Sequence, residues 1–301
     1  MNSVRVVEVG PRDGLQSERT SIPTDVKLRF IASLSQAGLH EIEATSFVSP
    51  KRVPQLADAA EVWPQLPEGP LYSALVPNLK GLENALKAGV KRIALFTAAS
   101  DAFTQQNIGM SVDESLRVFS EVEAQFRQAV PDGWIRGYVS TAFECPYAGL
   151  VKPEAVVRVA QRLLDLGVNE ISLGDTIGVA GPAETKRLIR ALPIQSKLAM
   201  HFHDTRGTAL ANVYAALEEG VRAFDSSAGG LGGCPYAPGA GGNLATEDLV
   251  YLLKREGLEV GIDLEKVSSA SLEVLALLGR APDSKVQRAV LSRASAAPCA
   301  N

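Results

Sequence analysis

The sequence predicts an α/β fold of the TIM, or (β/α)8, barrel class with a short helical extension at the C-terminus. Three observations support this prediction: short β-branched runs alternate with amphipathic stretches, eight such runs occur, and the helix-to-strand joints repeat one pattern. A chain of 301 residues with 46% hydrophobic content is long enough for one barrel with one core. A doubly wound open sheet is the second choice, because it normally has fewer strands and a nucleotide-binding glycine loop after the first.

The strand candidates are short runs rich in β-branched and aromatic residues, bounded by turn residues. In chain order they are Val4–Val9, Glu41–Ala44, Leu71–Val76, Arg92–Thr97, Trp134–Thr141, Glu170–Leu173, Lys197–Phe202 and Ala223–Ser226. Eight strands that are each followed by a helix predict a closed parallel barrel.

Amphipathic stretches of helical length follow most of these strands. They are Thr24–Ala37, Leu79–Ala88, Val112–Ala129, Lys152–Leu166, Pro182–Ala191, Ala209–Glu219 and Thr246–Glu256. Four of them end at a glycine, namely Gly38, Gly89, Gly167 and Gly220, and glycine suits the left-handed position that closes a helix.

We expect a single domain over residues 1–301, with the barrel at about 1–256 and a helical extension and tail at 257–301. We expect one helix over Val267–Leu278, which would cover the barrel or a partner subunit. The alanine- and serine-rich tail from Arg293 is expected to fray.

Composition disfavours several classes of partner. The net charge of −4 comes without a strongly basic block, so neither nucleic acid nor an anionic membrane surface is expected to bind. No apolar run approaches the roughly 20 residues of a membrane span. Three cysteines without the spacing of a disulfide framework fit a reducing compartment. The sequence starts without a leader-like segment, and we expect a cytoplasmic protein.

Two of the three histidines, His201 and His203, lie one residue apart at the end of a predicted strand. Side chains at positions i and i+2 of a strand share a face, so both imidazoles project together. Such a pair is better suited to hold a metal than to fill a core. His40 precedes a strand at the opposite end of the barrel, and we interpret it as structural.

Catalytic groups of a TIM barrel lie at the C-terminal ends of its strands, which brings distant residues to one rim. Asp13, after the first strand, is the natural third ligand, although Arg-Asp-Gly is also good turn chemistry. Asn243 offers an amide oxygen as a fourth ligand, or caps a helix starting near Leu244. These donors suit Mg²⁺ or Mn²⁺, while affinity alone does not exclude Zn²⁺ or Co²⁺.

Other polar residues share this rim. Arg12 either stabilises an oxyanion or enolate beside the metal, or forms a surface ion pair. Glu43 either orients Arg12 or a metal-bound water, or forms a structural ion pair. Asp175 follows the sixth strand at the same rim.

A glycine-rich loop from Gly229 to Gly242 follows the eighth strand and carries Cys234. This loop is a poor apolar environment for a structural cysteine, so we expect Cys234 to transfer a proton. The loop could cradle a phosphate, but it lacks the Gly-Lys-Ser/Thr ending of a P-loop, which favours a mobile lid.

Together, these residues give the sequence a family resemblance over nearly all of residues 4–260. It resembles the 3-hydroxy-3-methylglutaryl-CoA lyases, a family of metal-dependent barrel lyases. The matching segments are Val9–Gln16, Glu43–Lys51, Ser172–Val179, His201–Thr205, Gly230–Tyr236 and Gly242–Asp248. Arg-Asp-Gly with His-x-His also occurs in isopropylmalate, homocitrate and citramalate synthases and in related aldolases. The form Gly10–Gln16 and the cysteine-bearing loop are typical of the lyases.

The resemblance implies a reaction and a set of roles. The reaction is retro-Claisen cleavage of 3-hydroxy-3-methylglutaryl-CoA to acetyl-CoA and acetoacetate, as in leucine and ketone-body catabolism. The implied metal ligands are Asp13, His201, His203 and Asn243, holding Mg²⁺ or Mn²⁺. The implied catalytic residues are Arg12 for the enolate, Glu43 beside it, Cys234 from the lid, His201 in proton transfer, and Asp175 as a further acid. The family also leads us to expect a homodimer.

Three other functions remain open at this stage. A lyase for a longer 3-hydroxy-3-alkylglutaryl-CoA would use the same chemistry in a larger pocket. An acyl-CoA-dependent enzyme that condenses 2-oxo acids would run the bond formation in reverse, but such relatives usually carry a long C-terminal regulatory domain. A metal-binding barrel without catalysis would require the polar rim to be coincidental.

Overall fold

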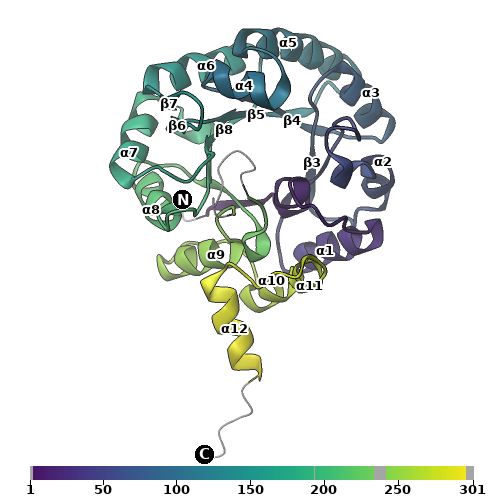
Figure 1. Ribbon diagram of the computed structural model, residues 1–301, viewed down its shortest axis with the longest axis vertical. Coiled ribbons are helices and arrows are strands. Elements are labelled where there is room, and N and C mark those ends of the chain that lie inside the picture. The colour runs from purple at the N-terminus through teal and green to yellow at the C-terminus, as the bar shows by residue number, and fades with distance from the viewer. Residues whose placement is uncertain (1–2, 193, 234–241, 296–301) are drawn as a thin grey trace, which may run out of the picture.

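Eight parallel strands close into a barrel, as the sequence predicts (Figure 1). Around the barrel they are β1 (Arg5–Glu8), β10 (Ala223–Ser226), β9 (Leu198–Phe202), β8 (Glu170–Asp175), β5 (Trp134–Ser140), β4 (Arg92–Ala98), β3 (Leu71–Leu75) and β2 (Glu41–Ser46). The computed structural model describes residues 3–192, 194–233 and 242–295. The barrel closes between β1 and β10, where Val7 pairs with Asp225.

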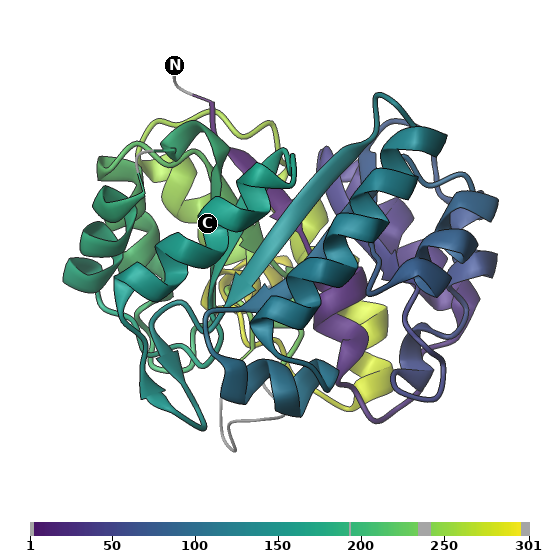
Figure 2. The ribbon, with the colours of Figure 1, turned by 90° about the horizontal axis from the view of Figure 1, so that it is seen from above.

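Helices form a layer around the strands, and Figure 2 shows this layer from the side. Every helix predicted between strands is present: α1 (Thr24–Gln36), α3 (Leu79–Lys87), α5 (Val112–Ala129), α6 (Pro153–Asp165), α7 (Pro182–Ala191), α8 (Ala209–Glu218) and α9 (Thr246–Arg255). Local sequence sets several of their starts. A capping box of Ser111 and Glu114 begins α5, and prolines occupy the first turn of α6 and α7.

The four predicted glycine joints all adopt the left-handed conformation. The φ angles of Gly38, Gly89, Gly167 and Gly220 lie between 82° and 92°. At Gly38 a Cβ atom would also lie 2.4 Å from the carbonyl oxygen of Gly261. Only glycine therefore fits this joint without displacing the extension.

The C-terminal extension differs from the prediction of a single helix over Val267–Leu278. The structure has α10 (Leu264–Ala270) and α11 (Leu272–Leu278), which are separated at Ser271. The hydroxyl group of Ser271 accepts a hydrogen bond from Gln287 Nε2 at 2.9 Å, a contact across the extension. The third helix, α12 (Lys285–Ser295), runs past Arg293 and projects from the barrel in Figure 1. The fraying expected from Arg293 stays a prediction.

Short elements between strands and helices were not predicted. They include η1 (Gly10–Gly14), α2 (Ala59–Val62), α4 (Asp101–Ile108) and the hairpin of β6 (Glu144–Cys145) and β7 (Gly149–Leu150). Their length explains this, because a run of eight residues or fewer gives little periodic signal. Within the described residues, no helix combines the length and apolar character needed to cross a membrane.

The buried interior contains both an apolar core and a charged centre. One hydrophobic cluster contains buried residues from both the barrel and the C-terminal extension, from Val4 to Leu275. The organisation of residues 1–301 as a single domain stays a prediction. Inside the barrel, Arg136 of β5 lies between Glu170, at 2.9 Å, and Asp225, at 2.6 Å. Burial of these charges is tolerated because each has an opposite partner.

Candidate metal centre and active site

Three predicted ligands lie together at the C-terminal rim of the barrel. Asp13, His201 and His203 each offer a ligand atom, and these atoms all lie within 4.8 Å of one another. His201 Nε2 is 3.8 Å from Asp13 Oδ2, and the two imidazole centroids are 5.3 Å apart. The structure thus joins residues that are almost 190 positions apart in the chain, as the rim of a barrel requires.

Asp13 is placed by a tight π-helical turn after β1. The carbonyl oxygen of Val9 accepts hydrogen bonds from the N–H groups of Arg12, Asp13 and Gly14, at 2.7–3.2 Å. Gly10 allows this winding, because a Cβ atom there would lie 2.5 Å from Glu8 Oε1. The Arg-Asp-Gly sequence is therefore a turn and a rim segment at once.

Asn243 lies beside the three ligands. Its backbone bridges His203 in antiparallel fashion, and its Nδ2 donates to Asp13 Oδ2 at 3.0 Å and to Leu231 O at 3.1 Å. The alternative role as a helix cap is wrong, because α9 begins at Thr246 with Ala245 at the cap position. The side chain of Asn243 is thereby left available to the rim.

The unpartnered atoms of this group fit a divalent cation. Two buried atoms, His203 Nδ1 and Asn243 Oδ1, have no hydrogen-bond partner among the residues that the structure describes. Buried polar atoms normally have partners, and an unpaired one is an exception that needs a physical reason. Both atoms can present a lone pair, as can the Asp13 carboxylate. Imidazole nitrogen with carboxylate and amide oxygen is a donor set that binds divalent cations.

The electrostatics of Asp13 and His203 favour the protonation states that bind metal. Burial raises the pKa of Asp13, but Arg12, the two histidines and the Asn243 amide outweigh it and lower the pKa to about 2. Burial and the neighbouring His201 lower the pKa of His203 to about 4. Burial lowers the pKa of His201, but the hydrogen bond with Asp225 and the charge of Asp13 raise it above its ordinary value. At neutral pH, Asp13 is thus ionised and His203 is neutral.

Arg12 is buried beside the ligands and is held on two sides. Its Nη1 donates to Asp13 Oδ1 at 2.6 Å, and its Nη2 donates to Glu43 Oε2 at 2.8 Å. Burial lowers the pKa of Arg12, but Glu43 and Asp13 raise it above its ordinary value, so the guanidinium is permanently charged. Of the alternatives for Glu43, the geometry favours orientation of Arg12.

The structure describes one of the two remaining predicted catalytic residues, Asp175, but not the other, Cys234. Asp175 ends β8, and its two carboxylate oxygens accept hydrogen bonds from the N–H groups of Val179 and Ala180, both at 3.0 Å. The structure therefore shows Asp175 holding the following turn, apart from the three clustered ligands. Cys234 and most of the predicted lid lie outside the described residues.

Sequence reasoning missed three residues behind the rim. The Tyr138 hydroxyl donates to Glu43 Oε2 at 2.6 Å, while Arg136 Nη2 donates to Asp225 Oδ1 at the same distance. All three lie inside predicted strands and were assigned no role from the sequence. A charged residue within an apolar strand, as in Ala223-Phe224-Asp225-Ser226, is the signal that could have identified Arg136 and Asp225.

A cavity of about 390 Å³ opens beside Arg12 and Asp13. Its lining includes the apolar side chains of Val48, Leu75, Phe96, Ile108 and Met110, together with polar ones such as Arg52, Asn78 and Asn107. The cavity thus presents apolar and polar side chains together beside Arg12 and Asp13, as expected for a site that binds a small organic substrate.

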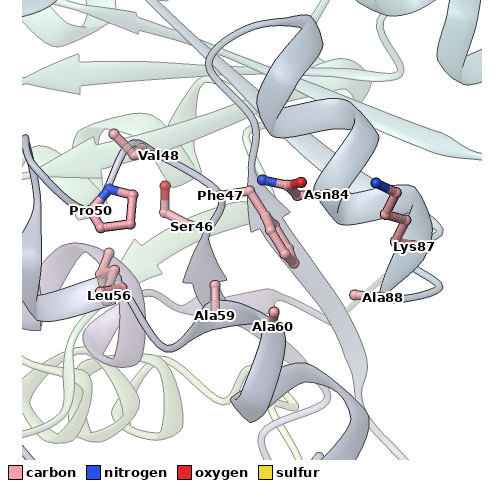
Figure 3. A pocket seen from close by; sticks show the side chains of 11 residues that line it. Ser46, Phe47, Val48, Pro50, Leu56, Ala59, Ala60, Asn84, Lys87 and Ala88 are labelled. Atoms are coloured by element: carbon pink, nitrogen blue, oxygen red, sulfur yellow. The ribbon is translucent and has the colours of Figure 1, made fainter.

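A second cavity, of about 350 Å³, lies outside the barrel (Figure 3). The side chains of Phe47, Ala59 and Ala60 line it, with Asn84 and Lys87 of α3 on one side. None of the clustered ligands lines this cavity. Since Lys87 is also paired with Glu83 at 2.6 Å, we assign the cavity no part in the site.

Comparison with known proteins gives consistent results. The HMGL-like family model matches residues 3–274. Hydroxymethylglutaryl-CoA lyase from Pseudomonas mevalonii is 50% identical, covering 98% of this chain and 99% of the relative. A relative from Pseudomonas aeruginosa, named 3-hydroxy-3-isohexenylglutaryl-CoA/hydroxy-methylglutaryl-CoA lyase, is 49% identical, covering 97% and 98%.

Solved structures agree with the sequence comparison. The crystal structure of hydroxymethylglutaryl-CoA lyase from Pseudomonas aeruginosa has a TM-score of 0.93 at 49% identity and covers 97% of this chain and 98% of that one. An HMG-CoA lyase from Acinetobacter baumannii, solved with coenzyme A and 3-methylmalate, has a TM-score of 0.90 at 39% identity, covering 100% and 97%. By sequence and by structure, then, this chain belongs to the HMGL-like family.

Proposed function

We propose that the chain is a carbon–carbon lyase that cleaves 3-hydroxy-3-methylglutaryl-CoA to acetyl-CoA and acetoacetate. One observation carries the proposal: Asp13, His201 and His203 meet at the barrel rim with the charged Arg12 beside them. The full-length likeness to relatives named hydroxymethylglutaryl-CoA lyase supports it.

We propose that Asp13, His201, His203 and Asn243 hold one divalent cation, Mg²⁺ or Mn²⁺. The support is geometric, since three of these residues cluster and the fourth has a buried oxygen without a partner. Such a cation, when bound, acts as a Lewis acid that makes a substrate hydroxyl group easier to deprotonate.

Arg12 supplies fixed positive charge where negative charge develops. Cleavage of the bond between C2 and C3 leaves its electron pair on the acetyl-CoA fragment, as an enolate whose oxygen belongs to the thioester. A rigid donor at such an oxygen stabilises the transition state by about 3–4 kcal/mol. Glu43 and Tyr138 hold the guanidinium in place, so little reorganisation is needed during the reaction.

Two proton transfers complete the reaction. A base, for which His201 is a candidate, removes the proton of the C3 hydroxyl group, and the new carbonyl becomes acetoacetate. We propose that Cys234 donates a proton to the enolate carbon, which gives acetyl-CoA. Asp175 stays a prediction as a further acid, and its contacts support a role in shaping the rim.

A longer 3-alkyl substituent is a second candidate for the substrate. The apolar side chains that line the cavity, such as Phe96 and Met110, offer contacts that a methyl group alone would leave unused. The relative from Pseudomonas aeruginosa is named for both substrates. Comparing kcat/KM for the methyl and isohexenyl thioesters separates the two, and Phe96→Trp should selectively lower kcat/KM for the longer one.

The release of acetoacetate from 3-hydroxy-3-methylglutaryl-CoA tests the main proposal. We expect release to stop after chelation and to return with Mg²⁺ or Mn²⁺, but not in Asp13→Ala. Absence of cleavage with either cation would contradict the assigned reaction, whereas full activity after chelation would contradict the metal requirement.

A homodimer and a cytoplasmic location also remain proposals. Light scattering on the purified protein tests the dimer, with a mass of 31.9 kDa expected for a single chain. The names of the relatives include both cytoplasmic and mitochondrial lyases.

A further inference from the structure

Asp225 is a buried carboxylate that none of the roles above uses. It lies in the middle of β10 with an exposed fraction of 1%, and it pairs in register with His201 of β9. An ionised side chain in the interior of a barrel is costly unless its partners compensate. The position therefore needs a physical reason, and its contacts supply one.

Each oxygen of Asp225 is engaged by a defined partner. Oδ1 accepts a hydrogen bond from Arg136 Nη2 at 2.6 Å, and Oδ2 accepts one from Ser172 Oγ at 2.9 Å. Oδ2 also lies 3.1 Å from His201 Nδ1. Because a carboxylate held by arginine can only accept, the proton of this last contact must belong to the imidazole.

This contact determines which nitrogen of His201 faces the rim. With Nδ1 carrying the proton, Nε2 has the free lone pair, and Nε2 is the atom that lies 3.8 Å from Asp13 Oδ2. Metal-binding histidines commonly donate their second N–H to a carboxylate, which fixes both the tautomer and the ring orientation.

We propose that Asp225 is a positioning residue that locks His201 in the tautomer able to bind the cation, and that Arg136 fixes the orientation of Asp225. This inference rests on the proposed cation site. It also narrows the mechanism: with Nδ1 committed to Asp225 and Nε2 to the cation, His201 is a ligand, and another group removes the hydroxyl proton.

The substitution Asp225→Asn tests the tautomer directly. Arg136 only donates hydrogen bonds, so the amide oxygen of asparagine must face it, and the NH₂ group must then face His201. Nδ1 is forced to accept, the proton moves to Nε2, and the lone pair that faced the rim is lost. A carboxylate-to-amide change behind a catalytic histidine acts in this way in serine proteases.

Nitrogen-15 NMR of the imidazoles reads the tautomer without any cation. The chain has three histidines, and His40→Gln and His203→Gln assign their signals. At an alkaline pH where the imidazole shifts no longer change, we expect Nδ1–H for His201 in the native protein and Nε2–H in Asp225→Asn. Nε2–H in the native protein would overturn the proposal, even if the variant failed to fold.

Cation affinity gives a second readout, measured by calorimetric titration of the apoprotein with Mn²⁺. We expect Asp225→Asn to bind Mn²⁺ about 10–100-fold more weakly, as for other outer partners of metal ligands. Ser172→Ala removes the other donor to the same oxygen, and Asp248→Asn makes the same chemical change at a buried carboxylate that is bound to Ser284 and Val286. Both controls should bind Mn²⁺ within about threefold of the native protein.

The outcomes separate this proposal from the proposed reaction. Native affinity in Asp225→Asn, or an equal loss in Asp248→Asn, overturns the positioning role. A native protein that binds Mn²⁺ but does not cleave the thioester contradicts the reaction alone, and the NMR and affinity comparisons still stand. A native protein with no Mn²⁺ affinity overturns the cation site and this proposal with it.

Discussion

Arg12 is the residue whose replacement should separate chemistry from cation binding. Its guanidinium is buried and paired with Asp13 and Glu43, and it is not itself a candidate ligand. We expect Arg12→Gln to lower kcat by about 10²–10³-fold, since one preorganised donor at a developing oxyanion is lost. Mn²⁺ affinity should be kept, because Asp13 loses a competing positive charge. Steady-state kinetics with a parallel Mn²⁺ titration measure both, and unimpaired turnover would remove Arg12 from the mechanism.

The sequence could predict rim residues but not the residues behind them. Asp13, His201, His203 and Asn243 follow strands, and the rule that barrel strands end at one rim brings them together without coordinates. Asp225 lies within a strand, where alternation alone predicts packing. Its role depends on contacts with β8 and β9, whose register the sequence does not state. Even at the rim, the position of a residue in the sequence does not determine its role. Asp175 follows a predicted strand, but its carboxylate oxygens accept hydrogen bonds from the N–H groups of the turn that follows it.

At the scale of elements, Asp248 of α9 provides the cap for α12. Its carboxylate accepts hydrogen bonds from Ser284 Oγ and from the N–H group of Val286, both at 2.8 Å. A side chain distant in sequence thus satisfies the start of the last helix.

We expect Asp248→Ala to lower the free energy of unfolding by about 1–2 kcal/mol, as for the loss of a helix cap. Hydrogen exchange should speed up most in α12, because that helix loses the partner of its first turn. Asp283→Ala is the control, since Asp283 pairs at the surface with Arg280, and it should change stability by less than about 1 kcal/mol. Unchanged exchange in α12 of Asp248→Ala would show that packing alone fixes this helix.

Elements with a strong periodic pattern were predicted well, and those shaped by distant contacts were not. The seven predicted helices around the barrel each bury one face, so the spacing of their apolar residues in the sequence predicts them. The break between α10 and α11 has no such local signal, because Ser271 is bound by Gln287 from the following helix. The π-helix at Gly10–Gly14 likewise depends on Glu8 and Ser227, which lie too close for side chains on its glycines.

For the whole molecule, two buried carboxylates should make stability fall as the pH rises. Burial raises the pKa of Glu8 to about 7, against opposing hydrogen bonds from Thr246, Ala228 and Gly10, and it raises the pKa of Glu247 to about 8. Both lie above the ordinary value of 4.5. These two groups therefore bind more protons in the folded than in the unfolded state from about pH 4.5 to pH 8, and their contribution to stability decreases across this range. The low pKa of His203 acts in the opposite direction below its ordinary value of 6.5.

Glu8→Gln isolates one of these contributions. The amide keeps the hydrogen-bonding shape but cannot ionise, so we expect a smaller loss of stability between pH 5 and pH 8 than in the native protein. Urea denaturation at several pH values measures the difference, and comparison with the native protein removes the contribution of the histidines. Parallel curves for the two proteins would show that Glu8 has an ordinary pKa.

A bound cation should also stabilise the whole fold, because its proposed ligands come from three distant segments. At a cation concentration 100 times the Kd, the expected gain is about 2.7 kcal/mol. Thermal unfolding with and without Mn²⁺ measures it as a rise in Tm. His203→Ala should abolish the rise, whereas His40→Ala, an exposed residue away from the ligand cluster, should keep it. An equal rise in both variants would mean that Mn²⁺ binds elsewhere.

Because the barrel closes by pairing its first strand, β1, with its last, β10, the residues of the candidate site come together late during synthesis. Asp13 leaves the ribosome early, but His201, His203 and Asn243 follow only when most of the chain has been made. A nascent or prematurely terminated chain would carry the carboxylate without the imidazoles, and so could neither hold the ion nor cleave the carbon–carbon bond of the substrate. Competence would then arise in one late step, when the final strand docks against the first.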